Sequence, residues 1–193
     1  FWILMVTFIA TLALGIEQGI GIGVILSLAM IIYRTSKPHI AELGNVPGTI
    51  FYRNKNRFDN VSIQNDILIV RIDAQMYFAN SNYIRESIES LLQNRGKGIK
   101  AVIINSDSIN NLDSSAIHTL DDMITDFKNQ GIQVMFSGVK GPVRDAMVKA
   151  DMIDKVGKEN FFMSVQSAVD RHNTQNHERK DHNQYILQSN VDH

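Results

Sequence analysis

The chain contains no cysteine among its 193 residues, which excludes a disulfide framework and thiolate metal sites. It also lacks a surplus of basic residues, because the formal net charge is −1, so nucleic acid is not expected as a partner. The sequence has no phosphate-binding Gly-x-x-x-x-Gly-Lys-Ser/Thr loop, no supported Ser/His/Asp arrangement and no cluster of metal ligands. We therefore predict a protein that is not an enzyme, with no catalytic residue, metal site or cofactor.

Charge is also nearly missing from the N-terminal part of the chain, where Glu17 is the only charged side chain before Arg34. Two apolar runs, residues 1–14 and 20–33, lie on either side of a short turn. A bilayer core needs roughly 20 helical residues, so each run is short for a span and would pack among other helices. We predict that residues 1–37 form the C-terminal transmembrane hairpin of an incomplete membrane domain, with the lipid bilayer and the rest of that membrane domain as partners.

Basic residues mark the end of this hairpin. Arg34 and Lys37 follow the second run, and Pro38 stops its helix. By the positive-inside tendency this end faces the cytoplasm, which places the remainder of the chain in the cytosol and the turn at Glu17 outside. Glu17 is either a wetted interfacial residue, which we favour, or a carboxylate on an ion pathway.

Glycines at positions 15, 19, 21 and 23 gather at the turn and at the start of the second apolar helix. The stretch "GIGIG" could suggest a dinucleotide-binding turn. That motif needs a preceding strand and a third glycine at the correct spacing, and the sequence offers neither. Small residues allow neighbouring helix backbones to approach closely, so these glycines predict helix packing.

Residues 46–172 alternate between strand and helix patterns. Three runs rich in Ile and Val, "DILIVRID", "KAVIINS" and "IQVMFSG", are typical of central strands buried on both faces. Amphipathic helices are predicted over "SNYIRESIESLLQNRG", "SSAIHTLDDMITDFKNQG" and "GPVRDAMVKADM". The alternation predicts an α/β domain whose mixed, mainly parallel sheet is covered by helices. We expect residues 46–172 to fold without the hairpin, with residues 38–45 as a linker.

The last residues, 173–193, are polar and rich in His and Asn, so we predict a disordered tail. His172, His177 and His182 recur at five-residue steps, which do not stack on one helix face. We therefore predict no metal site among them.

Three stretches in this order and spacing resemble one known family: "ELGNVPGTIFYRN", "ILIVRIDAQMYFANSNYIRESI" and "NNLDSSAIHTL". They are similar to the cytoplasmic STAS domain of SulP-type (SLC26-like) anion transporters, and the apolar hairpin resembles the last two membrane spans of that family. The resemblance runs from Phe1 to about His172. It implies the C-terminal part of a bacterial secondary transporter for a small anion such as sulfate or bicarbonate.

Several expectations follow from the resemblance alone. The protein would be a multi-pass protein of the bacterial inner membrane and a homodimer, with the STAS domain and the C-terminus in the cytoplasm as a regulatory and assembly module. The family's anion site is formed by half-helix ends in other parts of the membrane domain, so no residue of this chain is assigned a substrate-binding role. The alternative is a membrane-anchored STAS phosphoswitch or nucleotide-sensing domain of the anti-sigma-antagonist type, which would bind a cytosolic regulatory protein.

The tetrapeptide "DSSA" at residues 113–116 follows a strand pattern and begins a helix pattern. Asp113 can accept hydrogen bonds from free N–H groups of the first helical turn, a cap typically worth about 1 kcal/mol. In anti-sigma-antagonist STAS proteins the phosphoacceptor is the Ser directly after the Asp, which corresponds to Ser114, although Ala116 stands where that motif has Gly. Asp113, Ser114 and Ser115 are therefore the candidate regulatory loop. We favour the cap, and both roles can hold together.

Overall fold

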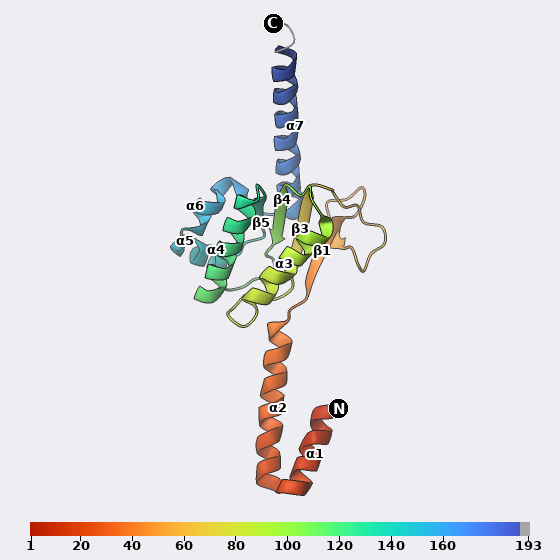
Figure 1. Ribbon diagram of the computed structural model, residues 1–193, viewed down its shortest axis with the longest axis vertical. Coiled ribbons are helices and arrows are strands. Elements are labelled where there is room, and N and C mark those ends of the chain that lie inside the picture. Colours follow the sequence, from red (N-terminus) through yellow and green to blue (C-terminus); the bar gives the residue numbers. More distant parts are fainter. Residues whose placement is uncertain (190–193) are drawn as a thin grey trace. The chain divides into compact units, whose positions relative to one another are not determined.

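The computed structural model describes the backbone of residues 1–189 and the side chains of residues 1–178. The chain divides into two compact units, Phe1–Pro38 and His39–His193 (Figure 1). Each unit is built from its own elements and is described by itself.

The first unit is a pair of apolar helices, α1 (Trp2–Leu14) and α2 (Ile16–Ser36). They are joined at Gly15, whose φ of 99° is readily adopted only by glycine. The 21 residues of α2 rise about 31 Å, close to the thickness of a bilayer core. Among the described helices, α2 is the one with the length and the apolar composition for a membrane crossing, and α1 is shorter.

Two of the glycines bring these helices together. A Cβ atom on Gly19 would lie 2.7 Å from the Cα of Thr11, and one on Gly23 would lie 3.0 Å from the Thr7 side chain. A Cβ on Gly21 would meet nothing within 4 Å. The close approach predicted from the glycines is therefore confirmed at positions 19 and 23, on one side of α2 only.

The second unit is built around a six-stranded sheet in the order β2-β1-β3-β4-β5-β6. Strands β3 to β6 run parallel to one another, and β1 runs antiparallel to both of its neighbours. The predicted mixed, mainly parallel sheet is confirmed. The strands are β1 (Ile40–Asn45), β2 (Tyr52–Asn54), β3 (Ile67–Ile72), β4 (Ala101–Asn105), β5 (Gln133–Ser137) and β6 (Phe161–Phe162).

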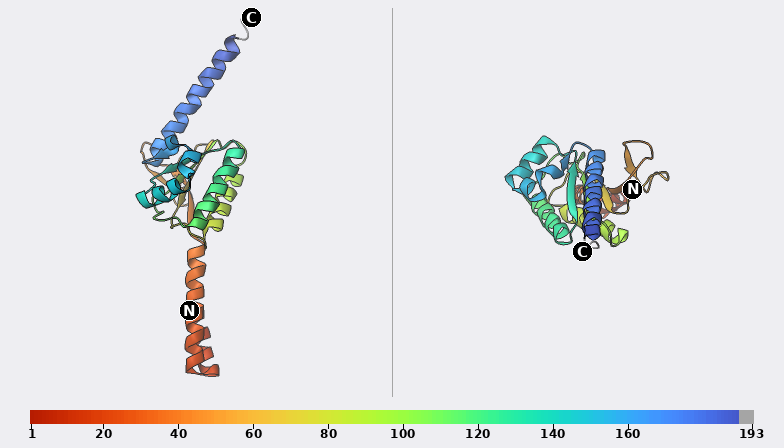
Figure 2. Two further views of the ribbon diagram at one scale, coloured as in Figure 1. Left: turned by 90° about the vertical axis from the view of Figure 1, so that its left-hand side faces the viewer. Right: turned by 90° about the horizontal axis from the view of Figure 1, so that it is seen from above.

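Helices cover both faces of this sheet, and α3 and α4 lie side by side on one of them (Figures 1 and 2). Alternate side chains of β3, β4 and β5 form a large apolar core with α3 to α6. The intervening side chains form a second, smaller core with the first turns of α7. The helices are α3 (Ser81–Arg95), α4 (Ser114–Asn129), α5 (Gly141–Lys149), α6 (Met152–Val156) and α7 (Val165–Ser189).

The segment expected to be a linker is instead an interior strand. Residues 40–45 form β1 between β2 and β3, and both Ala41 and Leu43 are buried in the smaller core. The second unit accordingly begins at His39, and the predicted boundary at residue 46 is wrong. The apolar pattern of this strand is interrupted by Glu42, which is why it does not resemble a buried strand in the sequence.

The predicted disordered tail also differs from the structure. Helix α7 continues through residues 173–189, and only 190–193 lie outside the described residues. The helix is anchored at its beginning, where Val165, Ala168 and Val169 pack on the sheet. A packed amphipathic start supplies the nucleus that an isolated polar helix lacks, and the polar residues then extend it.

Candidate functional site

The candidate regulatory loop lies at the edge of the sheet formed by the carboxyl ends of the parallel strands. The segments that leave β3, β4 and β5 meet at this edge because these strands are parallel neighbours. Ile40 pairs with Ile72, so the chain also enters the second unit here, through His39. In open α/β sheets this is the edge where ligands commonly bind.

Asp113 holds two segments of this edge together. Its backbone is extended, and its Oδ1 accepts a hydrogen bond of 2.8 Å from the N–H of Ala116, so the predicted cap of α4 is present. Its Oδ2 accepts a second hydrogen bond of 2.8 Å, from the N–H of Phe78 in the segment between β3 and α3. A backbone bridge between Met76 and Leu112 adds to this contact. One carboxylate thus caps a helix and fixes a loop 35 residues away.

Ser114 and Ser115 begin α4, and both are exposed. The start of α4 and the helix α5 border an open hollow with a volume of about 750 Å³, and Ser114, Pro142 and Lys149 are among its lining residues. The free N–H groups and the dipole of a helix N-terminus favour an anion, so a phosphate on Ser114 is electrostatically admissible there. Ser114 and Ser115 are therefore accessible, whereas Asp113 beside them is half-buried.

A compact ion-pair cluster stands at the point where the chain enters the domain. The Asp73 carboxylate accepts hydrogen bonds from the Arg71 guanidinium, at 2.5 and 3.0 Å, and lies 2.8 Å from Nδ1 of His39. The hydrogen bond from Arg71 is the main reason why the pKa of Asp73 lies below its usual value, and His39 acts in the same direction. Asp73 thus ties the entry of β1 to the end of β3.

One charged side chain, that of Glu42, is buried at a position where the sequence pattern does not predict a buried strand. Glu42 in β1 is 2% exposed, and its carboxylate forms an ion pair with Lys55 and lies 3.6 Å from the guanidinium of Arg95. Lys55 follows β2, and Arg95 lies in the last turn of α3. Glu42 therefore ties the β1–β2 hairpin to α3, which is a structural role.

Helix α7 is held to the sheet by a polar cluster at the opposite edge. His172 is buried, and its Nε2 lies 3.0 Å from Oδ2 of Asp66, which also accepts a hydrogen bond of 2.9 Å from Asn176. Burial alone would raise the pKa of Asp66, but the hydrogen bond and charge of His172, a backbone hydrogen bond and the charge of Lys100 together lower it. The spacing of the histidines in the sequence predicts only that His172 is not a metal ligand. The structure gives it an anchoring role.

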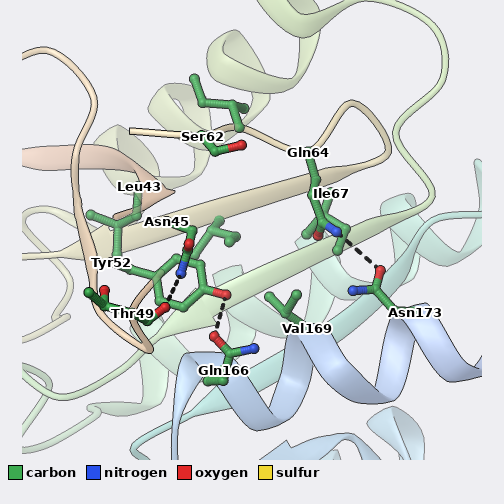
Figure 3. A pocket seen from close by; sticks show the side chains of 12 residues that line it. Leu43, Asn45, Thr49, Tyr52, Ser62, Gln64, Ile67, Gln166, Val169 and Asn173 are labelled. Carbon is green, nitrogen blue, oxygen red and sulfur yellow. Dashed lines mark hydrogen bonds between the residues drawn. The ribbon is translucent and has the colours of Figure 1, made fainter. Parts of the chain in front are cut away.

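A small pocket lies between α7 and the β1–β2 hairpin (Figure 3). Its volume is about 260 Å³, and its polar lining is uncharged. The hydroxyl of Tyr52 donates to Gln166 at 3.0 Å, and the amide of Gln64 donates to Asn173 at 3.2 Å. These two hydrogen bonds join α7 to the β1–β2 hairpin and to the segment that precedes β3.

The histidines considered as metal ligands do not form a metal site among the described side chains. No group of three His, Asp or Glu residues that could hold a metal ion occurs among the side chains that the structure describes. His118 lies on α4 with its Nδ1 3.0 Å from Oδ2 of Asp122, one turn further along the same helix. The side chain of His182 lies outside the described residues.

Comparison with known proteins adds the family context. Residues 59–168 match the family model described as "STAS domain". The chain is 38% identical over 173 residues to "Probable sulfate transporter 4.2" of Arabidopsis thaliana, an alignment that covers 85% of this chain and 26% of that protein. It is 37% identical to "Sulfate transporter 4.1, chloroplastic" of the same plant. The chain thus spans about a quarter of the length of these curated relatives.

Solved structures show the same fold. The murine Solute Carrier 26 family member A9 anion transporter in its inward-facing state matches with a TM-score of 0.76 at 20% identity, over 86% of this chain and 27% of that one. The STAS domain of a SulP transporter from Vibrio cholerae matches with a TM-score of 0.52 at 21% identity, over 64% of this chain and 93% of that one. Because the sequence identities are only about 20%, these two matches show the fold of the chain and nothing more.

Proposed function

Because the chain belongs to the STAS domain family and has sulfate transporters as relatives over most of its length, we propose that it is the STAS-containing part of a secondary anion transporter. One observation carries the proposal. The similarity to the sulfate transporters covers 85% of this chain, more than the STAS domain alone, and α2 has the length and composition of a membrane span. A protein that used only a soluble STAS domain would not need this apolar segment.

In this proposal the two units have different roles. Helices α1 and α2 belong to the membrane-embedded part, and the second unit is a cytoplasmic regulatory and assembly module of a dimeric protein. The anion would cross through other helices, and no residue of this chain is assigned to its binding. The protein is then a transporter and not an enzyme, in keeping with its relatives. Sulfate is the first anion to test, because the relatives are named sulfate transporters.

The location in a bacterial inner membrane stays a prediction from the sequence, since the curated relatives quoted above are plant proteins. What supports a membrane location in general is α2 and the transporter relatives. The basic residues Arg34 and Lys37 at the end of α2 support a cytoplasmic second unit.

Uptake of radiolabelled sulfate into proteoliposomes tests the main proposal. The full-length protein should accumulate sulfate above protein-free liposomes, and unlabelled sulfate should compete. Bicarbonate and other small anions serve as competitors that define the substrate. If neither sulfate nor any other small anion is carried under an imposed cation or anion gradient, the transporter proposal is wrong.

The regulatory part of the proposal concerns Ser114. A phosphate there would add roughly −1.5 to −2 charges at an exposed helix start, attracted by the helix end and repelled by Asp113 and Asp107. We expect this balance to shift how the loop docks rather than to unfold the domain. Ser114→Asp should therefore change the transport rate while the free energy of unfolding stays within about 1 kcal/mol.

Ser90→Asp is a suitable control, because Ser90 is exposed on α3. It should leave transport unchanged. If Ser114→Asp also leaves transport unchanged and no phosphopeptide contains Ser114 in cells, the candidate loop is a helix cap only. A membrane-anchored phosphoswitch that carries no anion is the alternative function, and its sign would be phosphorylation of Ser114 without any transport.

A further inference from the structure

The pocket between α7 and the β1–β2 hairpin combines an apolar floor with a polar rim (Figure 3). Three residues spaced along one face of α7 line it, Gln166, Val169 and Asn173. The floor belongs to the smaller core, because the lining residues Leu43 and Ile67 are buried there. An apolar cavity with a few polar groups at fixed positions is the usual composition of a site for a small molecule.

The polar groups of the rim form two hydrogen-bonded pairs. Tyr52 donates to Gln166 and Gln64 donates to Asn173, and Val169 lies on α7 between the two pairs (Figure 3). The oxygen of Tyr52 keeps acceptor capacity after it has donated its proton. Among the described contacts, the side chain of Asn173 takes part only as an acceptor, and its amide nitrogen lies on the side of Val169. A ligand can therefore donate to Tyr52 and accept from Asn173.

The charge of the surroundings selects an uncharged ligand. All residues that line the pocket are uncharged, so an ion would give up hydration there without gaining a counter-ion. Burial and the charge of Asp170 raise the pKa of Tyr52, while the Asn45 side chain acts in the opposite direction. The hydroxyl of Tyr52 thus stays neutral, and Asp170 opposes the entry of a sulfate or a phosphate.

The size of the pocket limits the ligand to a small ring. Its volume is about 260 Å³, and an apolar cavity of about 150 Å³ accepts a benzene ring, so this pocket has room for such a ring with polar substituents. The faces of a flat ring can contact Val169 and the apolar floor. Its edges then meet the two polar pairs.

We propose that this pocket binds a small uncharged ring compound of the cyclic-amide class, whose N–H donates to Tyr52 and whose carbonyl accepts from Asn173. The ligand is distinct from a transported anion, for which the pocket offers no positive charge. Because it contacts both α7 and the β1–β2 hairpin, the bound ligand holds these elements together and slows amide exchange in the first turns of α7.

Saturation-transfer difference NMR on the full-length protein in lipid nanodiscs, with uracil as the probe, tests the proposal. Uracil should receive magnetisation from the protein but none from nanodiscs without it, at the weak affinity expected of a small ligand. Orotate, the same ring with a carboxylate, should receive none. Asn173→Ala keeps a strong helix former at this position and removes the donor, so it should weaken uracil binding about tenfold.

A second pair of variants locates the site. Asn173→Trp fills the pocket and should abolish both the uracil signal and the slowing of amide exchange in α7. Thr174→Trp is the matched control, because Thr174 is the exposed neighbour on the same helix and does not line the pocket. It should leave both readouts unchanged.

Three results would overturn the proposal: no transfer to uracil in the unmodified protein, transfer to orotate equal to that of uracil, or uracil binding that neither Asn173 variant weakens. Circular dichroism shows whether each variant is folded, and Asn173→Ala decides the matter if Asn173→Trp is not. The assay measures binding and not uptake, so its result is independent of whether sulfate is transported.

Discussion

Replacing Asp113 tests whether this carboxylate holds the candidate loop together. Asp113→Ala removes the helix cap, which is worth about 1 kcal/mol. It also removes the hydrogen bond from the N–H of Phe78. Hydrogen bonds to charged groups are worth about 1.5–3 kcal/mol, and the partial exposure of Asp113 reduces this contribution. We expect the free energy of unfolding of residues 39–193 to fall by about 2–3 kcal/mol. Guanidinium titration followed by circular dichroism measures it, and an unchanged slope would show that only stability has changed.

Two further variants separate the two hydrogen bonds. Asn is as good a cap as Asp, so Asp113→Asn keeps the bond to Ala116 and loses the charged bond to Phe78, with an expected cost of about 1 kcal/mol. Ser114→Ala changes an exposed side chain and should stay within about 0.5 kcal/mol. The reasoning is refuted if Asp113→Ala costs less than about 0.5 kcal/mol, or if Asn costs as much as Ala.

Three other predictions follow from the fold. Residues 39–193 should fold alone whereas residues 46–193 should not, because the shorter chain lacks the interior strand β1. Burial of the Leu43 side chain in this strand contributes about 1.5–3 kcal/mol to stability by itself. Amide exchange distinguishes the two chains, and a folded 46–193 would contradict the assigned boundary. The pKa of Asp73 is lower in the folded protein than in the unfolded chain, so its stabilising contribution is complete above about pH 4 and is lost as the pH falls through the folded value. Arg71→Met should reduce this acid-induced loss when the free energy of unfolding is measured from about pH 5 to about pH 2. An unchanged dependence of the free energy of unfolding on pH would refute the pairing. A Cβ on Gly23 would lie 3.7 Å from the Cβ of Thr7, a distance that suits a disulfide, so the double variant Thr7→Cys with Gly23→Cys should crosslink α1 to α2. Adding Gly19→Leu should abolish this crosslink, whereas adding Gly21→Leu should not. Equal effects of the two leucines would contradict the close contact between the helices.

The central part of the fold could be predicted because its sequence signals are local. Strands β3 and β4 are rich in Ile and Val, β5 contains the apolar run Val134–Phe136, and the apolar periodicity of α3 and α4 marks their buried faces. Strand β1 could not be predicted in the same way. It contains Glu42, whose burial depends on Lys55 and Arg95, and Gly44, where a Cβ would come within 2.9 Å of Val61. Both features require partners that are distant in the sequence.

The candidate site shows the same division. The cap at Asp113 could be predicted because it depends on a helix start three residues away. Its second bond, to Phe78, could not, since nothing in the sequence relates the two segments before the sheet brings them together. The anchoring of α7 by His172 and Asp66 likewise joins residues 106 positions apart, so the polar composition of the last residues predicted a disordered tail where the structure has a helix.

The interior position of β1 has a mechanical consequence. The hydrogen bonds of antiparallel neighbours run perpendicular to the strands, so tension applied to the chain before His39 along the axis of β1 would load the bonds to β2 and β3 together, in shear. The backbone N–H of Asp73 also bonds to the carbonyl of His39, and the carboxylate holds its ring. A pull on the entering chain is therefore resisted by both neighbouring strands and is transmitted to the end of β3, from which the segment carrying Phe78 departs.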